Sequence, residues 1–340
     1  MFTRVVLSFL LAGAVAYGQT RERGKFSIQG EAAMLMAVDP QTKFVLIGFS
    51  AGSVCVFPAD QRIVNLYTFS IHKKAVTGAG FLPDAKKFVT CSLEGTLRLW
   101  DTEAARKHHK AMEDSNGDGK PEIPKPLLSV SAHSGYGVTC LSVSPDGKQV
   151  ATGATDGTVK IWDAETLKQL ASLAGTHPGG MRTVQYSPDG KVLASGGVDK
   201  SAKLWDASEV KPALLHKIEG HVGTVNAVAF SADGKRLATG SGIAKKSGLV
   251  QVWDVATAKL AFKLEGHEDV VTCILFHPKT EHLASGCADK KIRVWNLKDK
   301  MVEYTDEHGE GLRNMLITPD GTRFGTCSDR TVRWWAGFGK

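Results

Sequence analysis

One eight-residue motif recurs along the chain and constrains the fold more than any other feature. It begins with an acidic residue, continues with alternating polar and apolar residues, and ends in Trp-Asp or Trp-Asn. Its four clearest copies are EGTLRLWD (94–101), DGTVKIWD (156–163), DKSAKLWD (199–206) and DKKIRVWN (289–296). Weaker copies end at Trp253-Asp254, at Trp335-Ala336 and at Phe57-Pro58, where Phe replaces Trp. The alternation is typical of half-buried strands, and repeated copies of one unit indicate a repeat architecture.

A second signal lies upstream of each copy, as a Gly-His pair or its remnant. The pairs are Gly30-Glu31, Ile71-His72, Ala132-His133, Thr176-His177, Gly220-His221, Gly266-His267 and Glu307-His308. Between the two signals, a short apolar strand leads through a turn such as Ser-Pro-Asp-Gly (144–147 and 187–190) into a second strand. Successive Trp or Phe anchors are 40 to 62 residues apart. Most of these intervals lie near the period of about 40–45 residues that is typical of a four-stranded blade, and the longer ones contain insertions.

Because Gly-His, Asp and Trp-Asp recur at nearly constant offsets, the chain resembles the WD-repeat β-propeller family over roughly residues 25–340. The resemblance implies an all-β fold, a seven-bladed β-propeller, here expected over residues 24–340 and as a monomer. Physical reasoning agrees, since one four-stranded blade has two faces that only neighbouring blades can cover. The last repeat stops after its third strand, and residues 26–30 match the outer strand at 262–266. We therefore expect an N-terminal strand to complete the last blade and to remove two exposed sheet edges.

The family resemblance also implies a structural role for His, Ser or Thr, Asp and Trp residues within one repeat, which form a hydrogen-bonded chain. Three repeats supply a full set: His133, Thr152, Asp156 and Trp162; His177, Ser195, Asp199 and Trp205; and His267, Ser285, Asp289 and Trp295. These sets have the composition of a catalytic triad. A catalytic triad does not recur in several copies, so we interpret them as structural and expect no catalytic residue.

The first eighteen residues predict a signal peptide. Arg4 precedes the apolar run Val5–Ala16, and small residues follow at a suitable distance for cleavage after Ala16 or, preferably, Gly18. The alternatives are an uncleaved anchor or a buried first strand, but twelve residues are too few to cross about 30 Å of hydrocarbon. We expect an exported protein, periplasmic or secreted, with no membrane insertion once the signal is removed.

The six cysteines are an even number, which in an oxidising compartment would favour disulfides. Their positions favour packing instead. Cys140 and Cys273 occupy matching strand positions, and Cys287 and Cys327 each precede an Asp by two residues in matching turns. A free Cys behaves as a small apolar residue at such places. We therefore expect buried thiols, with disulfides as the alternative.

The largest departure from the repeat is the insertion 103–126, which follows a Trp-Asp. It begins with a segment that predicts a short helix (103–112) and continues with the pattern D-x-N-x-D-G-x-x-E. Calcium favours such oxygen ligands; the candidates are Asp114, Asn116, Asp118, the carbonyl of Lys120, and Glu122. Lys125 stands where a full EF-hand has a bidentate Glu. The alternative is a solvated, metal-free loop of the same composition.

A second insertion, 242–247, lengthens a turn beside the Gly-His loops. In the family this face, with the mouth of the central channel, often binds proteins or peptides, and the resemblance implies the same here. The candidate contacts near the Gly-His positions are Lys73, Tyr136, Met181, Arg182, Glu268, Asp269 and Arg313. The alternative is that these are ordinary solvated loop residues.

Other functional classes lack their usual sequence signals. The chain has no nucleophile–base pair outside the repeated sets, no G-x-x-x-x-G-K-[ST] loop and no H-E-x-x-H motif. A net charge of +7 with short Lys runs does not indicate a nucleic-acid site. The sequence thus favours a non-catalytic, exported protein-interaction scaffold. The alternatives are a calcium- or ligand-binding periplasmic propeller accessory to an envelope enzyme, and an enzyme that uses the channel mouth.

Overall fold

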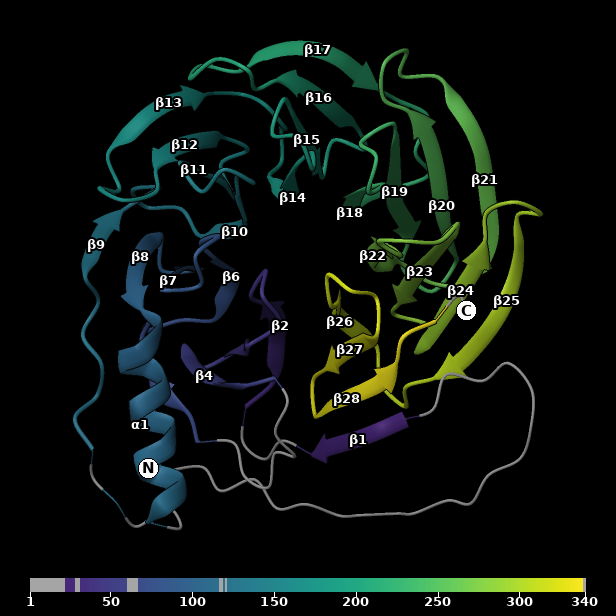
Figure 1. Ribbon diagram of the computed structural model, residues 1–340. Coiled ribbons are helices and arrows are strands. Elements are labelled where there is room, and N and C mark those ends of the chain that lie inside the picture. The colour runs from purple at the N-terminus through teal and green to yellow at the C-terminus, as the bar shows by residue number, and fades with distance from the viewer. Residues whose placement is uncertain (1–21, 28–30, 60–66, 116–118, 120, 339–340) are drawn as a thin grey trace.

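A computed structural model describes residues 22–27, 31–59, 67–115, 119 and 121–338, and the predicted signal peptide lies outside these ranges. Within them, the strands form seven four-stranded antiparallel sheets arranged as blades around a central axis (Figure 1). The protein is an all-β, seven-bladed propeller, which confirms the predicted fold class.

In blades 1 to 6, the chain runs from the innermost strand to the outermost strand. Blade 1 contains β2 (Ala33–Val38), β3 (Phe44–Phe49), β4 (Ser53–Pro58) and β5 (Phe69–Ser70); blade 2 contains β6 (Val76–Phe81), β7 (Lys87–Ser92), β8 (Thr96–Asp101) and β9 (Leu128–Ser131); blade 3 contains β10 (Val138–Val143), β11 (Gln149–Ala154), β12 (Val159–Asp163) and β13 (Gln169–Leu173). Blade 4 contains β14 (Met181–Tyr186), β15 (Val192–Gly197), β16 (Ala202–Asp206) and β17 (Ala213–Ile218); blade 5 contains β18 (Thr224–Phe230), β19 (Arg236–Ile243), β20 (Ser247–Asp254) and β21 (Leu260–His267); blade 6 contains β22 (Val271–Phe276), β23 (His282–Cys287), β24 (Lys291–Asn296) and β25 (Met301–Glu307).

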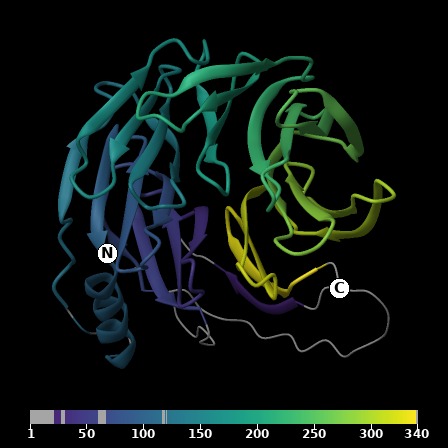
Figure 2. The ribbon, with the colours of Figure 1, turned by 45° about the horizontal axis from the view of Figure 1, so that its top comes forward.

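Blade 7 is built from both ends of the described chain. It contains β26 (Leu312–Ile317), β27 (Arg323–Ser328) and β28 (Thr331–Ala336), and its outermost strand is β1 (Glu22–Ser27). β1 runs antiparallel to β28, with Glu22 opposite Trp335 and Ser27 opposite Thr331. Figures 1 and 2 show β1 beside β28 from two directions. Residues 28–30, which the sequence also assigns to this strand, lie outside the described residues.

The hydrophobic core is a series of layers, each shared by two neighbouring blades. In one layer, Leu46 and Val56 of blade 1 pack with Val76, Phe88 and Trp100 of blade 2. Because strand residues alternate between the two faces of a blade, each apolar face depends on the next blade for burial. The layer between the last and first blades has the same construction, with Leu316, Cys327 and Val332 packed against residues of β3 and β4.

Each Ser-Pro-Asp-Gly turn joins the first and second strands of a blade, and hydrogen bonds of its own side chains stabilise it. In blade 3, the Asp146 carboxylate accepts hydrogen bonds from Ser144 Oγ at 2.7 Å and from the Lys148 backbone N–H at 3.0 Å. Gly147 has a φ of 71°, in the left-handed region that glycine adopts without strain. This local chemistry explains why the same four residues mark the same turn in successive repeats.

All six cysteines are free and buried, and the disulfide alternative is therefore wrong. Cys55, Cys91 and Cys327 lie inside the inter-blade layers with no exposed surface. Burial raises the pKa of Cys140 and Cys273 to about 12. The thiols act as small apolar side chains, as the sequence predicts.

The insertion after β8 folds as helix α1 (Thr102–Asp114), whose N-cap residue Asp101 accepts a hydrogen bond from the Ala104 N–H at 2.7 Å. The helix packs on β4 of blade 1, where its buried His108 and His109 contact the rings of Phe69 and Phe57. The described part of β5 is only two residues long and pairs only with the start of β4. The helix thus covers part of a sheet edge, one of the ways in which proteins protect such edges. Across the described residues, no helix combines the length and the apolar character needed to cross a bilayer.

Candidate functional site

The face of the ring that carries the Gly-His loops, here called the Gly-His face, is fixed by a hydrogen-bonded chain in each of six blades. Blade 4 shows it in full. The His177 Nδ1 is 2.8 Å from Asp199 Oδ1 and its Nε2 is 2.8 Å from Ser195 Oγ, which also accepts the Trp205 Nε1–H at 3.0 Å. The chain links the loop before the first strand to the second strand, the following turn and the third strand. It therefore holds that edge of the blade in one geometry.

Blade 6 repeats this arrangement, and blade 3 has a looser version. In blade 6, His267 lies 2.9 Å from Asp289 and 2.7 Å from Ser285, which accepts the Trp295 Nε1–H at 2.8 Å. In blade 3, His133 bonds Thr152 at 3.0 Å and Trp162 donates to the same hydroxyl at 2.8 Å, but Asp156 is 3.7 Å from the imidazole. The structure thus brings together the members of all three sets named from the sequence.

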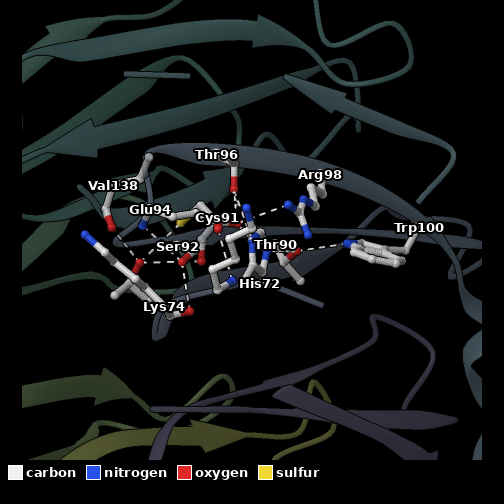
Figure 3. Close-up of polar contacts among 12 residues, drawn as sticks. His72, Lys74, Thr90, Cys91, Ser92, Glu94, Thr96, Arg98, Trp100 and Val138 are labelled. Atoms are coloured by element: carbon white, nitrogen blue, oxygen red, sulfur yellow. Dashed lines mark hydrogen bonds and ion pairs between the residues drawn. The ribbon is translucent and has the colours of Figure 1, made fainter. Parts of the chain in front are cut away.

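Blade 2 contains a fourth full set, in addition to the three that the sequence indicates (Figure 3). His72 bonds Glu94 Oε1 at 2.6 Å and Thr90 Oγ1 at 2.9 Å, and Trp100 donates to Thr90 at 2.9 Å. Glu94 replaces the usual Asp, and Arg98 lies 3.2 Å from the same carboxylate. The signal was present in the sequence as His72 and an acidic residue at the matching motif position.

Blades 5, 7 and 1 depart further from the pattern. In blade 5, the predicted turn insertion extends β19 and β20 as a hairpin, and His221 Nδ1 contacts the Lys200 carbonyl at 3.1 Å instead of a carboxylate. In blade 7, His308 bonds Thr326 at 2.9 Å. Blade 1 has no His at this position, and Ser53 donates to Glu31 at 2.6 Å.

Burial favours the neutral form of the histidines in the sets of blades 2 to 6. It lowers the pKa of His72, His133 and His221 to about 4. Burial alone would raise the pKa of Glu94, but hydrogen bonds from Thr96 and His72 hold it near 2. The blade 2 set therefore combines a neutral imidazole with an ionised carboxylate that accepts several hydrogen bonds.

The hydroxyls in these sets are unsuited to nucleophilic attack. Thr90, Thr152, Ser195 and Ser285 have no exposed surface, and each is bonded to a tryptophan indole. A nucleophile must instead reach a substrate in a near-attack geometry.

A group with metal-ligating atoms, His267, Cys287 and Asp289, coincides with the blade 6 set. The guanidinium of Arg293 donates to Asp289 Oδ2 at 2.9 Å and also contacts His267. A dication at this position would meet a fixed positive charge, so the arrangement fits a structural ion pair better than a metal site.

The seven residues proposed as partner contacts do not all lie on the surface. Tyr136 is 52% exposed, and Lys73, Arg182, Glu268 and Arg313 are also exposed. Arg313 pairs with Asp329 at 2.7 Å, and the half-buried Asp269 accepts the Lys245 N–H at 2.9 Å. Met181 does not belong to this set, because it is 1% exposed and packs in the layer between blades 3 and 4.

The calcium hypothesis for residues 114–122 stays a prediction. Asn116, Asp118 and Lys120 lie outside the described residues. Asp114 is exposed and 3.4 Å from Lys110, and Glu122 is exposed and 3.3 Å from Lys125.

The Gly-His face is also tied together across blades. Each innermost strand has a β-bulge near its start, and three threonines at that point bond the carbonyl of the next blade: Thr77 to Val138 at 2.6 Å, Thr139 to Met181 at 3.0 Å and Thr272 to Leu312 at 2.8 Å. These bonds fix neighbouring blades relative to one another. The face is therefore a rigid platform that presents loops.

The comparison with protein families agrees with this construction. The family model described as "WD domain, G-beta repeat" matches residues 63–101, 124–163, 167–206, 212–254, 258–296 and 300–336. Each match ends at a Trp-Asp position or its equivalent. The copy that ends at Phe57-Pro58 in blade 1 lies outside the six matches.

Curated relatives show the same similarity over most of the chain. Protein hir1 of Schizosaccharomyces pombe is 27% identical over 246 residues, which are 72% of this chain and 22% of the relative. WD repeat-containing protein 70 of Xenopus laevis is 29% identical over 80% of this chain and 42% of the relative. Nuclear distribution protein nudF of Aspergillus niger is 24% identical over 79% and 60%, respectively. The chain therefore spans less than two thirds of the length of each of these relatives.

Proposed function

Since the chain belongs to the family of WD-repeat β-propellers, we propose that it is a non-catalytic scaffold that binds a protein or peptide partner on its Gly-His face. Proteins of this fold commonly act through partners. The observation that carries the proposal here is that the His–Ser/Thr–Trp sets have a structural role. In blades 2 to 6, each of these triad-like sets holds its blade together through a buried hydroxyl, and burial lowers the pKa of its histidine. Function then belongs to the loops that the blades display.

The structure of the Gly-His face supports partner binding by a preformed surface. Its loops are anchored by the histidine sets and by the threonine bonds between blades, so little conformational entropy is lost when a partner binds. Arg182 and Glu268 are exposed on this face and offer charges of both signs. Exposed Arg and Tyr side chains are favoured at interface centres.

Capture of partners by the purified full chain tests this function. We expect a protein to be retained in stoichiometric amount, and Arg182→Glu or Glu268→Lys to weaken its retention. Lys191→Glu, an exposed charge in the turn at the opposite end of blade 4, is the matched control and leaves retention unchanged. Failure to retain any protein from the native compartment, together with turnover in a hydrolase and lyase screen, would contradict the scaffold function and favour an enzyme.

The proposal includes export, which rests on the sequence of residues 1–18. Cell fractionation with an antibody against the chain tests it. Recovery of a shortened chain that begins near Gln19 in the periplasm or medium supports export, and recovery of the full-length chain in the cytoplasm contradicts it. We also propose that the exported protein is a monomer. Analytical ultracentrifugation would test this by measuring its mass in solution.

A further inference from the structure

Four exposed side chains lie on neighbouring loops where blades 2 and 3 meet on the Gly-His face. They are Lys73, Lys74, Leu93 and Tyr136, here called the Tyr136 surface. The Leu93 backbone N–H bonds the Ala75 carbonyl at 3.1 Å, which ties its turn to the loop that carries both lysines. A Cβ on Gly137 would lie 3.0 Å from Leu93 Cδ2, so the loop of Tyr136 also packs directly against Leu93.

Tyr136 is exposed because its loop is one residue longer than the equivalent loops. Four residues (134–137) separate His133 from β10, whereas three separate His72 from β6 and three separate His177 from β14. The extra length is taken up by a turn in which the Tyr136 N–H bonds the His133 carbonyl at 3.0 Å, with Gly135 at a φ of 79°. The result is an aromatic ring that is 52% exposed, next to Leu93, which is 38% exposed.

Within the ranges that the structure describes, the Tyr136 phenol has no hydrogen-bond partner. A buried or interfacial tyrosine usually finds one. An aromatic ring with a free polar tip beside an aliphatic side chain is the composition of an interface centre.

Lys73 and Lys74 give this surface positive charge, and the carboxylate of the neighbouring Glu94 is engaged in hydrogen bonds. Glu94 Oε1 accepts from Thr96 at 2.7 Å and lies 3.2 Å from Arg98, while Oε2 accepts the Lys73 N–H at 3.0 Å. Only 11% of the Glu94 side chain is exposed. Neither Lys73 nor Lys74 forms an ion pair with any described residue, and in Figure 3 the Lys74 side chain extends away from His72 and Arg98.

We propose that the Tyr136 surface binds an acidic peptide segment that carries an apolar anchor residue. The anchor packs against Leu93 and the Tyr136 ring, and flanking carboxylates pair with Lys73 and Lys74. A nucleic acid offers phosphates to the two lysines but no aliphatic side chain to pack against Leu93. This inference rests on the proposed scaffold function and specifies the chemistry of its partner.

Selection of a phage-displayed library of random 12-residue peptides on the purified full chain tests the inference. We expect the enriched peptides to share an aliphatic or aromatic residue within a run of Asp and Glu. A synthetic peptide from the enriched set then serves as the probe in fluorescence titrations. Raising the salt concentration from 0.05 to 0.5 M should weaken its binding about tenfold, because ion pairs at an exposed surface are screened.

Matched variants locate the binding site. Tyr136→Ala should weaken binding at least tenfold and Tyr136→Phe about twofold or less, and Lys73→Ala with Lys74→Ala should weaken it about tenfold and reduce its salt dependence. The controls Val222→Ala and Ile243→Ala remove exposed apolar side chains from the same face in blade 5 and should leave binding unchanged. Equal melting temperatures of all variants establish that the fold is intact.

The inference is overturned if no peptide is enriched, if the enriched peptides lack acidic residues, or if Tyr136→Ala binds as well as the wild type. A 12-nucleotide oligodeoxythymidine that competes as well as the peptide would also overturn it, in favour of a general polyanion surface. If a native protein is captured equally well by the wild-type chain and Tyr136→Ala, the scaffold function stands and the acidic-peptide surface fails.

Discussion

At the scale of single residues, one buried hydroxyl links the histidine to the tryptophan in each hydrogen-bonded set. Ser285 Oγ is the partner of both His267 Nε2 and the Trp295 Nε1–H in blade 6. Ser285→Ala leaves two buried polar groups without a partner and should lower the free energy of unfolding by about 2–3 kcal/mol. Urea denaturation measures this change.

The repeats themselves supply the controls for this variant. Thr occupies the equivalent position in blade 2 (Thr90) and blade 3 (Thr152), so Ser285→Thr should lower the unfolding free energy by about 1 kcal/mol or less. Ser172→Ala, on the exposed strand β13, should be neutral. If Ser285→Ala and Ser172→Ala have equal stability, the hydroxyl is not the link that the geometry indicates.

The neutral histidines make stability depend on pH in a defined direction. The folded-state pKa values of His72, His133 and His221 are about 4, below the value of about 6.5 expected in the unfolded chain. Between these values the unfolded chain binds more protons, so each histidine removes up to about 1.4 kcal/mol of stability per pH unit as the pH falls. Glu94, with a pKa near 2, adds to this loss below about pH 4.5.

We therefore expect the melting temperature to be highest above about pH 7 and to fall steadily toward pH 5. Thermal scans at constant ionic strength measure it. His221→Gln should melt lower than the wild type at pH 8 and show a shallower decline, since one titrating group is gone. A melting temperature that does not change between pH 7 and pH 5 would contradict the neutral, buried state of these rings.

At the scale of elements, the strand β1 completes blade 7 and covers the edge of β28. Removal of residues 1–27 should lower the melting temperature by about 10 °C or more and promote association through the uncovered edge. The control is a chain that lacks only residues 1–21 and keeps the strand. Equal melting temperatures of the two truncated chains would show that the strand contributes little.

Elements also show how far the sequence predicts the structure. Gly-His and Trp-Asp spacing predicts the blades because each residue pair has a fixed place in a four-stranded unit. The same pattern does not predict that Met181 is buried while Arg182 is exposed, because a bulge after the first residue of β14 decides the direction of each side chain. The repeat pattern also does not predict that His108 and His109 of α1 pack on blade 1. That contact depends on the length of β5, the outer strand of blade 1.

Single-residue changes in the repeat also shape the site, and their effect on the surface follows only from the structure. Glu94 serves in place of an Asp because its longer side chain still reaches His72. The exposure of Tyr136 follows from one extra loop residue. This residue is recognised only when the loops between each histidine and the following strand are compared. Both differences are small in sequence and large in their effect on the surface.

At the scale of the whole molecule, all six thiols depend on the closed ring for their burial. Cys91, Cys140 and Cys287 are free, and their raised pKa values leave almost no thiolate, the reactive form, at neutral pH. We expect less than one thiol per chain to react with Ellman's reagent in an hour at pH 7.5 in the native state, and six in guanidinium chloride. A reducing agent should leave the melting temperature unchanged, and rapid reaction of several thiols would show that the blades separate.

The meeting of both chain ends in one blade has a mechanical consequence. Glu22 lies opposite Trp335, so the start of β1 and the end of β28 lie at the same end of this strand pair. Tension applied between the two termini would peel these strands apart one backbone bond after another, whereas heat must disrupt whole layers of packed side chains at once. Tension between the two ends would therefore detach β1 at low force, while the blades stay stacked through their layers of side chains.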